Sequence, residues 1–260
     1  DRRDFIRAGV LGAASFSISG LTRAFPRSAP SGVIDVTLVA ERIVKSMVDG
    51  LSIPVWRFRD PAGSGPGDLA SGLVVEQGDT INVTVENDLD RPINFVVPGV
   101  LEGTPTVAAG GSRLYSLPAP AAGSYFYSDD VNGEIARAMS LSGPLIVMPP
   151  GSQNVLYTGG PRFDQQYTLV LSELDDRLNA AIDAGQPYDM ANFEPNYFFA
   201  NGLSFPDTAG DPETLIAMSQ GEDIALRLIN AGVITNPMHF HGYHVEVATR
   251  NRQPENVVVD

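Results

Sequence analysis

Three histidines, the only ones in the chain, lie within six residues of one another at His239, His241 and His244. Residues two apart in a β-strand point to the same face, so a strand here would present His239 and His241 side by side. Two neutral imidazoles on one face form half of a transition-metal site. The apolar run from Tyr243 to Ala248 predicts a buried strand directly after the pair.

The pair has a second interpretation, in which both histidines are hydrogen-bonded inside a domain interface. His244 fits an ordinary surface or core position better than a ligand position. Met238 carries a thioether, a soft copper ligand, but its place on the alternate face predicts core packing. The chain has no cysteine, so it offers no thiolate ligand and no disulfide.

Composition predicts a globular, all-β protein and excludes some partners. The chain has 260 residues, of which 43% are hydrophobic, 26 are glycines and 20 are prolines. Runs of Val, Ile and Thr recur along it. The net charge is −14, from 31 acidic and 17 basic residues, which excludes a nucleic-acid partner because phosphate binding needs clustered Lys and Arg. The sequence begins with Asp1 and ends inside a valine-rich run, so we expect a piece of a longer protein.

The first residues resemble a twin-arginine export signal. The paired Arg2 and Arg3 are followed by Phe5 and Ile6 and then by a weakly apolar stretch from 8 to 21. That stretch has about 14 residues, whereas a membrane-spanning helix needs about 20. The alternative is a basic amphipathic helix start. We expect export, with cleavage near Ala24 and a periplasmic or extracellular location; no other stretch predicts a transmembrane segment.

Period-two alternation, broken by Gly and Pro clusters, predicts a series of short strands. The predicted strands are 33–40, 54–59, 73–75, 80–86, 143–148, 167–174, 215–218 and 223–229, with a helical piece at 178–185 and an Asn-Gly turn at 201–202. The Pro-Pro-Gly after the strand at 143–148 closes the first unit. We therefore predict a signal and leader at 1–32, one domain at 33–150, a linker at 151–166 and a second domain at 167–260.

An internal repeat relates the two predicted domains. Residues 78–87 and 221–230 each run from glycine through an acidic residue and an alternating apolar strand to asparagine, at an offset of 143 residues. The repeat predicts two copies of one β-domain. Shortly after it, the first copy has Asn94-Phe95-Val96 where the second has His239-Phe240-His241.

The chain resembles the multicopper oxidases, which are built of cupredoxin domains. The resemblance is carried by Gly-Ser-Tyr-Phe-Tyr-Ser-Asp-Asp at 123–130, Gly-Pro-Leu-Ile-Val at 143–147 and Asn-Pro-Met-His-Phe-His-Gly at 236–242. It implies two cupredoxin-like Greek-key β-sandwich domains, the second truncated at the C-terminus. It also implies copper as the cofactor, with His239 and His241 as ligands.

Several positions depart from the family pattern. The four first-domain histidines of the family's trinuclear copper cluster fall on Asn94, Val96, Ser128 and Asp130, and the first ligand of the later motif falls on Asn236. Reduction of oxygen to water takes four electrons and therefore several coupled copper ions. Two histidines cannot hold that many ions. His239 and His241 could hold one copper or zinc ion if other residues supply further ligands. The weaker candidates for these further ligands are Asp130, Asp129 and His244. A solvated turn is the alternative for the acidic pair.

Three functions follow from these patterns, and no catalytic residue is identified. The first is an exported oxidoreductase with a reduced copper complement, acting with a small-molecule reductant or oxygen. The second is a non-enzymatic cupredoxin-fold scaffold of the cell envelope without copper. The third is a homotrimer or other homo-oligomer that completes a metal site between subunits, as two-domain relatives of the family do.

Overall fold

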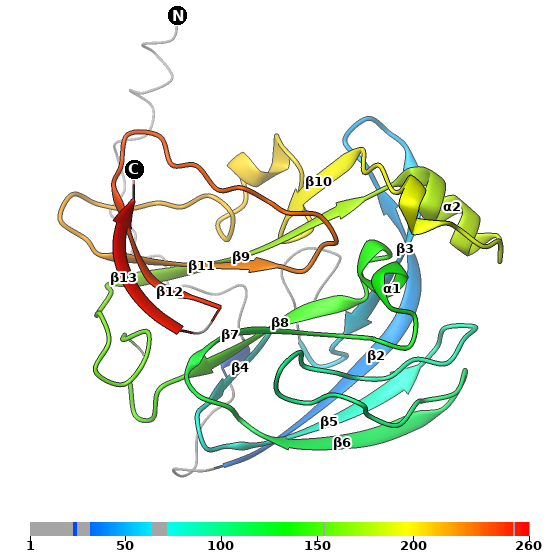
Figure 1. Ribbon diagram of the computed structural model, residues 1–260, viewed down its shortest axis with the longest axis horizontal. Helices are drawn as coiled ribbons and strands as arrows, with labels where there is room; N and C mark the ends of the chain where they lie inside the picture. The colour runs from blue at the N-terminus through cyan, green and yellow to red at the C-terminus, as the bar shows by residue number, and fades with distance from the viewer. Residues whose placement is uncertain (1–22, 25–31, 64–71, 153, 252, 260) are drawn as a thin grey trace, which may run out of the picture.

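Strands dominate the computed structural model, which describes residues 23–24, 32–63, 72–152, 154–251 and 253–259 (Figure 1). The predicted all-β class is therefore confirmed. The signal and most of the leader predicted at 1–32 lie outside the described residues. Among those described, no helix is long and apolar enough to cross a membrane.

Two four-stranded sheets form the first unit. One has the order β3-β2-β5-β6 and the other the order β1-β4-β8-β7. The strands of the first sheet are β2 (Val33–Ser46), β3 (Ser52–Arg59), β5 (Thr80–Asn87) and β6 (Ser112–Pro118). Those of the second are β1 (Arg23–Ala24), β4 (Leu73–Glu76), β7 (Gly123–Ser128) and β8 (Ser142–Met148). Alternation sets the faces: in β5, Ile81, Val83 and Val85 are buried while the residues between them are not.

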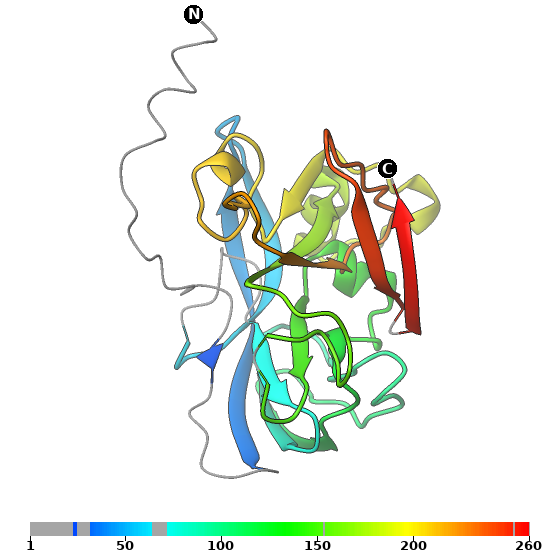
Figure 2. The ribbon, with the colours of Figure 1, turned by 90° about the vertical axis from the view of Figure 1, so that its left-hand side faces the viewer.

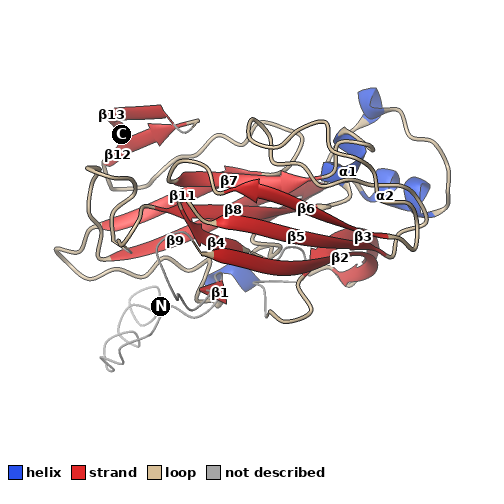
Figure 3. Cartoon of the chain, turned by 90° about the horizontal axis from the view of Figure 1, so that it is seen from below, coloured by secondary structure: helices blue, strands red, loops and turns tan. Residues whose placement is uncertain are grey.

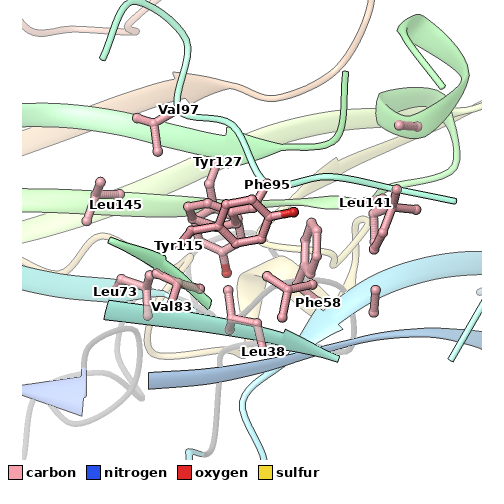
Figure 4. Close-up of a cluster of buried hydrophobic side chains, with 14 of the residues drawn as sticks. Leu38, Phe58, Leu73, Val83, Phe95, Val97, Tyr115, Tyr127, Leu141 and Leu145 are labelled. Atoms are coloured by element: carbon pink, nitrogen blue, oxygen red, sulfur yellow. The ribbon is translucent and has the colours of Figure 1, made fainter. Parts of the chain in front are cut away.

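Aromatic side chains fill the space between these two sheets (Figure 4). The ring of Tyr127 lies 5.5 Å from that of Phe58 and 5.3 Å from that of Phe95, and Phe95 lies 5.8 Å from Tyr115. Burial of each such ring stabilises the fold by about 1.5–3 kcal/mol. Because Phe95 is 1% exposed, it fixes its neighbours Asn94 and Val96 at the edge of the core.

The second unit has two further sheets. The first, of order β10-β9-β11, consists of β9 (Gln165–Leu174), β10 (Tyr197–Ala200) and β11 (Ile224–Asn230). The second is the hairpin of β12 (Val245–Arg250) and β13 (Gln253–Val259). The helical elements are α1 (Glu134–Ala138), α2 (Asp176–Asp183) and the short turns η1 (Met190–Asn192) and η2 (Asp207–Ala209). The helices α1 and α2 lie at the end of the molecule opposite the hairpin (Figure 3).

The two units share apolar contacts: Leu178 and Ile182 of α2 belong to the main core of the first unit, and two smaller apolar clusters also join the units. One joins Met47, Ile53 and Val55 to Leu174 and Phe199, and the other joins Ile146 and Met148 to Phe163, Ala225 and Ile229. The strand β2 is longer than predicted, and Ile43 in its additional part packs against the first cluster. Its residues 33–40 pair with β5, whereas 39–46 pair with β3 and reach the second unit. The hairpin lies on the side of the molecule away from β2 and β3 (Figure 2).

Both copies of the internal repeat begin in the same way. Gly78 and Gly221 have φ of 93° and 90°, a left-handed conformation that glycine adopts without strain. The next residue accepts a backbone hydrogen bond from three residues earlier, at 2.8 Å in Asp79 and 2.7 Å in Glu222. The strand that follows pairs in parallel with the first strand of its own sheet, β5 with β2 and β11 with β9.

The two copies also end in the same way. Asn87 Oδ1 accepts the backbone N–H two residues on, and its Nδ2 donates to the carbonyl of Arg91 at 2.8 Å. Asn230 repeats both bonds, with its Nδ2 donating to the carbonyl of Ile234 at 2.7 Å. The repeated sequence therefore has one local structure in both units.

Some predicted elements are corrected by the structure. Residues 215–218 form no strand, because the hydroxyl of Tyr167 bonds both the N–H and the carbonyl of Ala217 and so takes the place of a neighbouring strand. The helical piece lies two residues earlier than predicted, since Asp175 caps its N-terminus by accepting the N–H of Arg177. The strand after the histidines starts at Val245 and is largely exposed rather than buried; Tyr243 is 65% exposed.

Candidate metal centre

His239 and His241 lie side by side on the loop of residues 231–244 between β11 and β12, here called the histidine loop. Their ring centroids are 4.7 Å apart and the ring planes meet at 80°. The predicted strand is wrong, because Pro237 has no N–H for a ladder and Gly242 has a φ of 78°. Both imidazoles are exposed to solvent, so the loop brings the pair together without a strand.

The other donors near the pair do not complete a site. His244 is exposed, and Met238 is 43% exposed, so the core packing predicted for Met238 is wrong. Among the described residues, no three His, Cys, Asp or Glu side chains gather closely enough to hold a metal ion. The structure thus assembles two imidazoles, and the assignment of these histidines as ligands stays a prediction.

Asn236 has a structural role in the histidine loop. Its Nδ2 donates to Asn230 Oδ1 at 3.2 Å and to the carbonyl of Ile234 at 3.4 Å. The same two residues are already joined by the bond from Asn230 to Ile234. The side chain at this position therefore closes the turn that leads to His239.

The four first-unit positions that depart from the family pattern lie together. Val96 and Ser128 exchange both backbone hydrogen bonds, at 2.9 and 3.0 Å. Beside them, Asn94 Nδ2 donates to Asp130 Oδ1 at 2.5 Å, and the N–H of Asp130 donates to Asn94 Oδ1 at 3.0 Å. A reciprocal amide–carboxylate pair thus joins the two segments, and we call Asn94 with Asp130 the amide clamp.

Asp129 is buried, and both of its oxygens are engaged. Oδ1 accepts the backbone N–H groups of Asn94 and Val131, and Oδ2 accepts the backbone and side-chain N–H of Asn132. The alternative for the acidic pair was a solvated turn. Asp130 fits this alternative because it is exposed, whereas Asp129 does not, since it is only 2% exposed. Neither carboxylate belongs to a metal-binding group with the histidines among the described residues.

Two residues that matter here were missed by the sequence patterns. Asn132 links the two segments, because its Nδ2 donates to Asp129 Oδ2 at 2.6 Å and to the carbonyl of Pro92 at 3.1 Å. Glu173 is buried beneath the start of the histidine loop. The available signal for Glu173 was an acidic residue inside an otherwise apolar strand end, which calls for a hydrogen-bonded partner.

The sequence is similar to one protein family and to one curated protein. Residues 181–258 match the family model described as Multicopper oxidase. "Putative laccase-11" of Oryza sativa subsp. japonica is 27% identical over 176 residues, which are 62% of this chain and 32% of the relative. The chain therefore spans about a third of the length of that curated relative.

Solved structures agree with this comparison. The blue copper oxidase from Nitrosomonas europaea matches with a TM-score of 0.68 and 24% identity, covering 88% of this chain and 70% of that one. The copper nitrite reductase from the same organism matches with a TM-score of 0.59 and 21% identity, covering 77% and 68%. The chain therefore has the cupredoxin-like fold of these structures, and residues 181–258 match the multicopper oxidase family model.

Copper is the cofactor that this family implies, and the two units fit it differently. The first unit does not fit, because its four positions offer no imidazole and the amide clamp already satisfies Asn94 and Asp130. The second unit offers two adjacent, exposed imidazoles, a donor type that copper binds well. The residues present therefore fit half of one copper site and not a cluster.

Proposed function

We propose that this chain is an exported, multicopper-oxidase-like protein that binds copper through His239 and His241. It would bind fewer copper ions than the family's full set. The observation that carries the proposal is the placement of the two imidazoles at 4.7 Å within the matched family domain. Copper, when bound, would supply one-electron redox chemistry, so an oxidoreductase acting with a small-molecule reductant or oxygen is the proposed class.

Residues of this chain would hold the copper ion and keep the histidine loop in place. Imidazole nitrogens of His239 and His241 would hold the ion, and the bonds from Asn236 to Asn230 and Ile234 would keep the loop in place. The exposure of both rings leaves the ion open to further ligands. Four-electron reduction of oxygen is not proposed for this chain alone, since its first unit supplies no histidine.

A second function, a copper-free scaffold of the cell envelope, is favoured by one observation. In the first unit, Asn94 and Asp130 lie where the family has copper ligands, and the amide clamp and the bond from Asn94 to Asp129 satisfy them within the protein. Such a unit needs no metal for its stability. If the histidine pair also binds no metal, the fold serves only to bind a partner.

Further parts of the proposal concern organisation. We propose domains at 33–150 and 167–260 joined by 151–166, because the repeat has the same local structure in each unit. Export would follow from the paired arginines at the N-terminus. A homotrimer in which a neighbouring subunit adds ligands to the histidine pair is also proposed; sedimentation that shows only monomer would refute it.

Copper affinity tests the function directly. We expect the full chain to bind Cu(II), and H239A and H241A each to weaken binding at least tenfold in competition with a chromophoric chelator, because either change halves the imidazole set. V258A is the control, since it changes an exposed aliphatic side chain of the neighbouring hairpin that offers no donor atom, and it should bind copper like the wild type. Equal affinity in the wild type, H239A and H241A would overturn the proposal.

A further inference from the structure

Glu173 is a fully buried acidic residue near the end of β9, with 0% of its surface exposed. Its Oε1 accepts the backbone N–H of Val233 and, at 2.9 Å, that of Ile234. Burial of a carboxylate is costly unless hydrogen bonds compensate it. The two N–H groups at the start of the histidine loop provide this compensation, so the loop and the carboxylate hold each other.

Gly232 lets the carboxylate approach the loop. A Cβ at this position would lie 2.0 Å from Glu173 Oε2 and 2.5 Å from its Cδ, closer than any real contact. Oε2 itself has no hydrogen-bond partner among the described residues. Only a glycine therefore allows the carboxylate to sit directly against the backbone that precedes Val233 and Ile234.

Arg137 holds the same turn from the first unit. It lies on α1, and its Nε donates to the carbonyl of Ala231 at 3.2 Å. Burial lowers the pKa of Arg137, and the negative charge of Glu173 partly opposes that shift. The first residues of the histidine loop are thus fixed by a cation from one unit and an anion from the other.

We propose that Glu173, seated against Gly232, is a positioning residue that sets the course of the histidine loop and thereby the placement of His239 and His241. Its anchor points at Val233 and Ile234 precede His239 by six and five residues, and the bonds of Asn236 fix the turn between them. The consequence for copper rests on the proposed function, whereas the anchoring of the loop does not.

The experiment measures the anchor and the metal separately on the full chain. Amide hydrogen exchange at Val233 and Ile234 reports the anchor, and chelator competition reports the dissociation constant for Cu(II). The variants are E173L, which removes the acceptor, and G232A, which keeps the glutamate but introduces the clash. The controls are E222L, which removes another carboxylate that accepts a backbone N–H, and G210A, where a Cβ would lie 3.8 Å from the carbonyl oxygen of Asp207, an ordinary contact distance.

We expect amide exchange at 233 and 234 to accelerate about tenfold or more in E173L and G232A and copper affinity to fall about tenfold, as is typical when an outer-shell partner is lost. E222L and G210A should behave like the wild type in both measurements. Unchanged exchange at 233 and 234 in E173L and G232A would overturn the inference.

The two proposals fail in different ways. A wild-type chain that binds no copper refutes the proposed function, and the exchange data still decide the anchor. Faster exchange with unchanged copper affinity refutes the positioning role, because the loop would then be loosened without consequence for the pair. Fluorescence of the buried Trp56 in the first unit verifies that each variant is folded.

Discussion

The amide clamp yields a quantitative prediction about stability. In N94A the chain loses the bond to Asp130 Oδ1 at 2.5 Å, the bond from the Asp130 N–H at 3.0 Å, and a longer one to the carbonyl of Thr104 at 3.4 Å. A bond to a charged group contributes about 1.5–3 kcal/mol and a neutral one about 1 kcal/mol. Because Asp130 is exposed and regains water, we expect a net loss of about 2 kcal/mol.

A surface pair in the same unit provides the control. Asn82 Nδ2 donates to Asp35 Oδ1 at 2.9 Å on the solvent side of β5 and β2. N82A removes the same chemical pair where water replaces it readily, so it should cost about 0.5 kcal/mol or less. The two variants should therefore differ by about 1.5 kcal/mol, roughly a tenfold difference in the ratio of folded to unfolded protein.

Urea unfolding followed by fluorescence measures this difference. Trp56 is the only tryptophan, is 3% exposed, and stacks against the guanidinium of Arg91 at 4.6 Å, so its emission reports the first unit. The loss in N94A should be the same with EDTA and with added copper, because the clamp needs no metal. A loss no larger than that of N82A, or one that copper reverses, would refute the reasoning.

Three further predictions concern stability. S140G should raise the free energy of unfolding by about 1–2 kcal/mol in urea, since Ser140 has a φ of 73° and its buried hydroxyl has no partner among the described residues. A lower value would show that the backbone there is unstrained. Burial, with the charge of Asp211, raises the pKa of Glu213 to about 7. The stability that depends on protonated Glu213 is complete below about pH 4.5 and is lost as pH rises through about 7; after allowance for solvent screening the loss is about 1 kcal/mol. E213Q should flatten that part of the pH profile, and an unchanged profile would contradict the assignment. D175A should cost about 3 kcal/mol, because the buried carboxylate accepts N–H groups of Arg177 and a distant loop. Burial raises the pKa of Asp175, but the bonds from Arg177 and other donors outweigh burial and lower the pKa overall. The stability that ionised Asp175 contributes is therefore present above about pH 4 and lost below it. A urea midpoint of D175A equal to that of the wild type would contradict this prediction.

Local patterns predicted the parts of the fold that depend on neighbouring residues. The alternation of Ile81, Val83 and Val85 defined β5, and the shared Gly-acid start of 78–87 and 221–230 anticipated two units with the same local structure. The His-x-His spacing predicted adjacent imidazoles on a strand; the rings are 4.7 Å apart, but a loop and not a strand brings them together. These features are encoded within ten residues, which is why the sequence alone sufficed.

Contacts between distant segments could not be predicted in this way. The hydroxyl of Tyr167 replaces a neighbouring strand at Ala217, fifty residues later, and so abolishes a strand that local propensity favoured. Glu173 meets Val233 and Ile234 only after the chain has folded back on β9. The burial of Asp129 likewise depends on Asn94, 35 residues earlier, so it was not visible in the acidic pair itself.

Bound copper per chain, measured after loading with Cu(II) and dialysis, tests the central claim most directly. We expect one copper per chain in the wild type, one in D130A, which breaks the amide clamp in the first unit, and none in H239A/H241A. Copper retained by H239A/H241A would place the metal elsewhere, and a wild type without copper would leave the histidine pair without its proposed role. Either result would contradict the account.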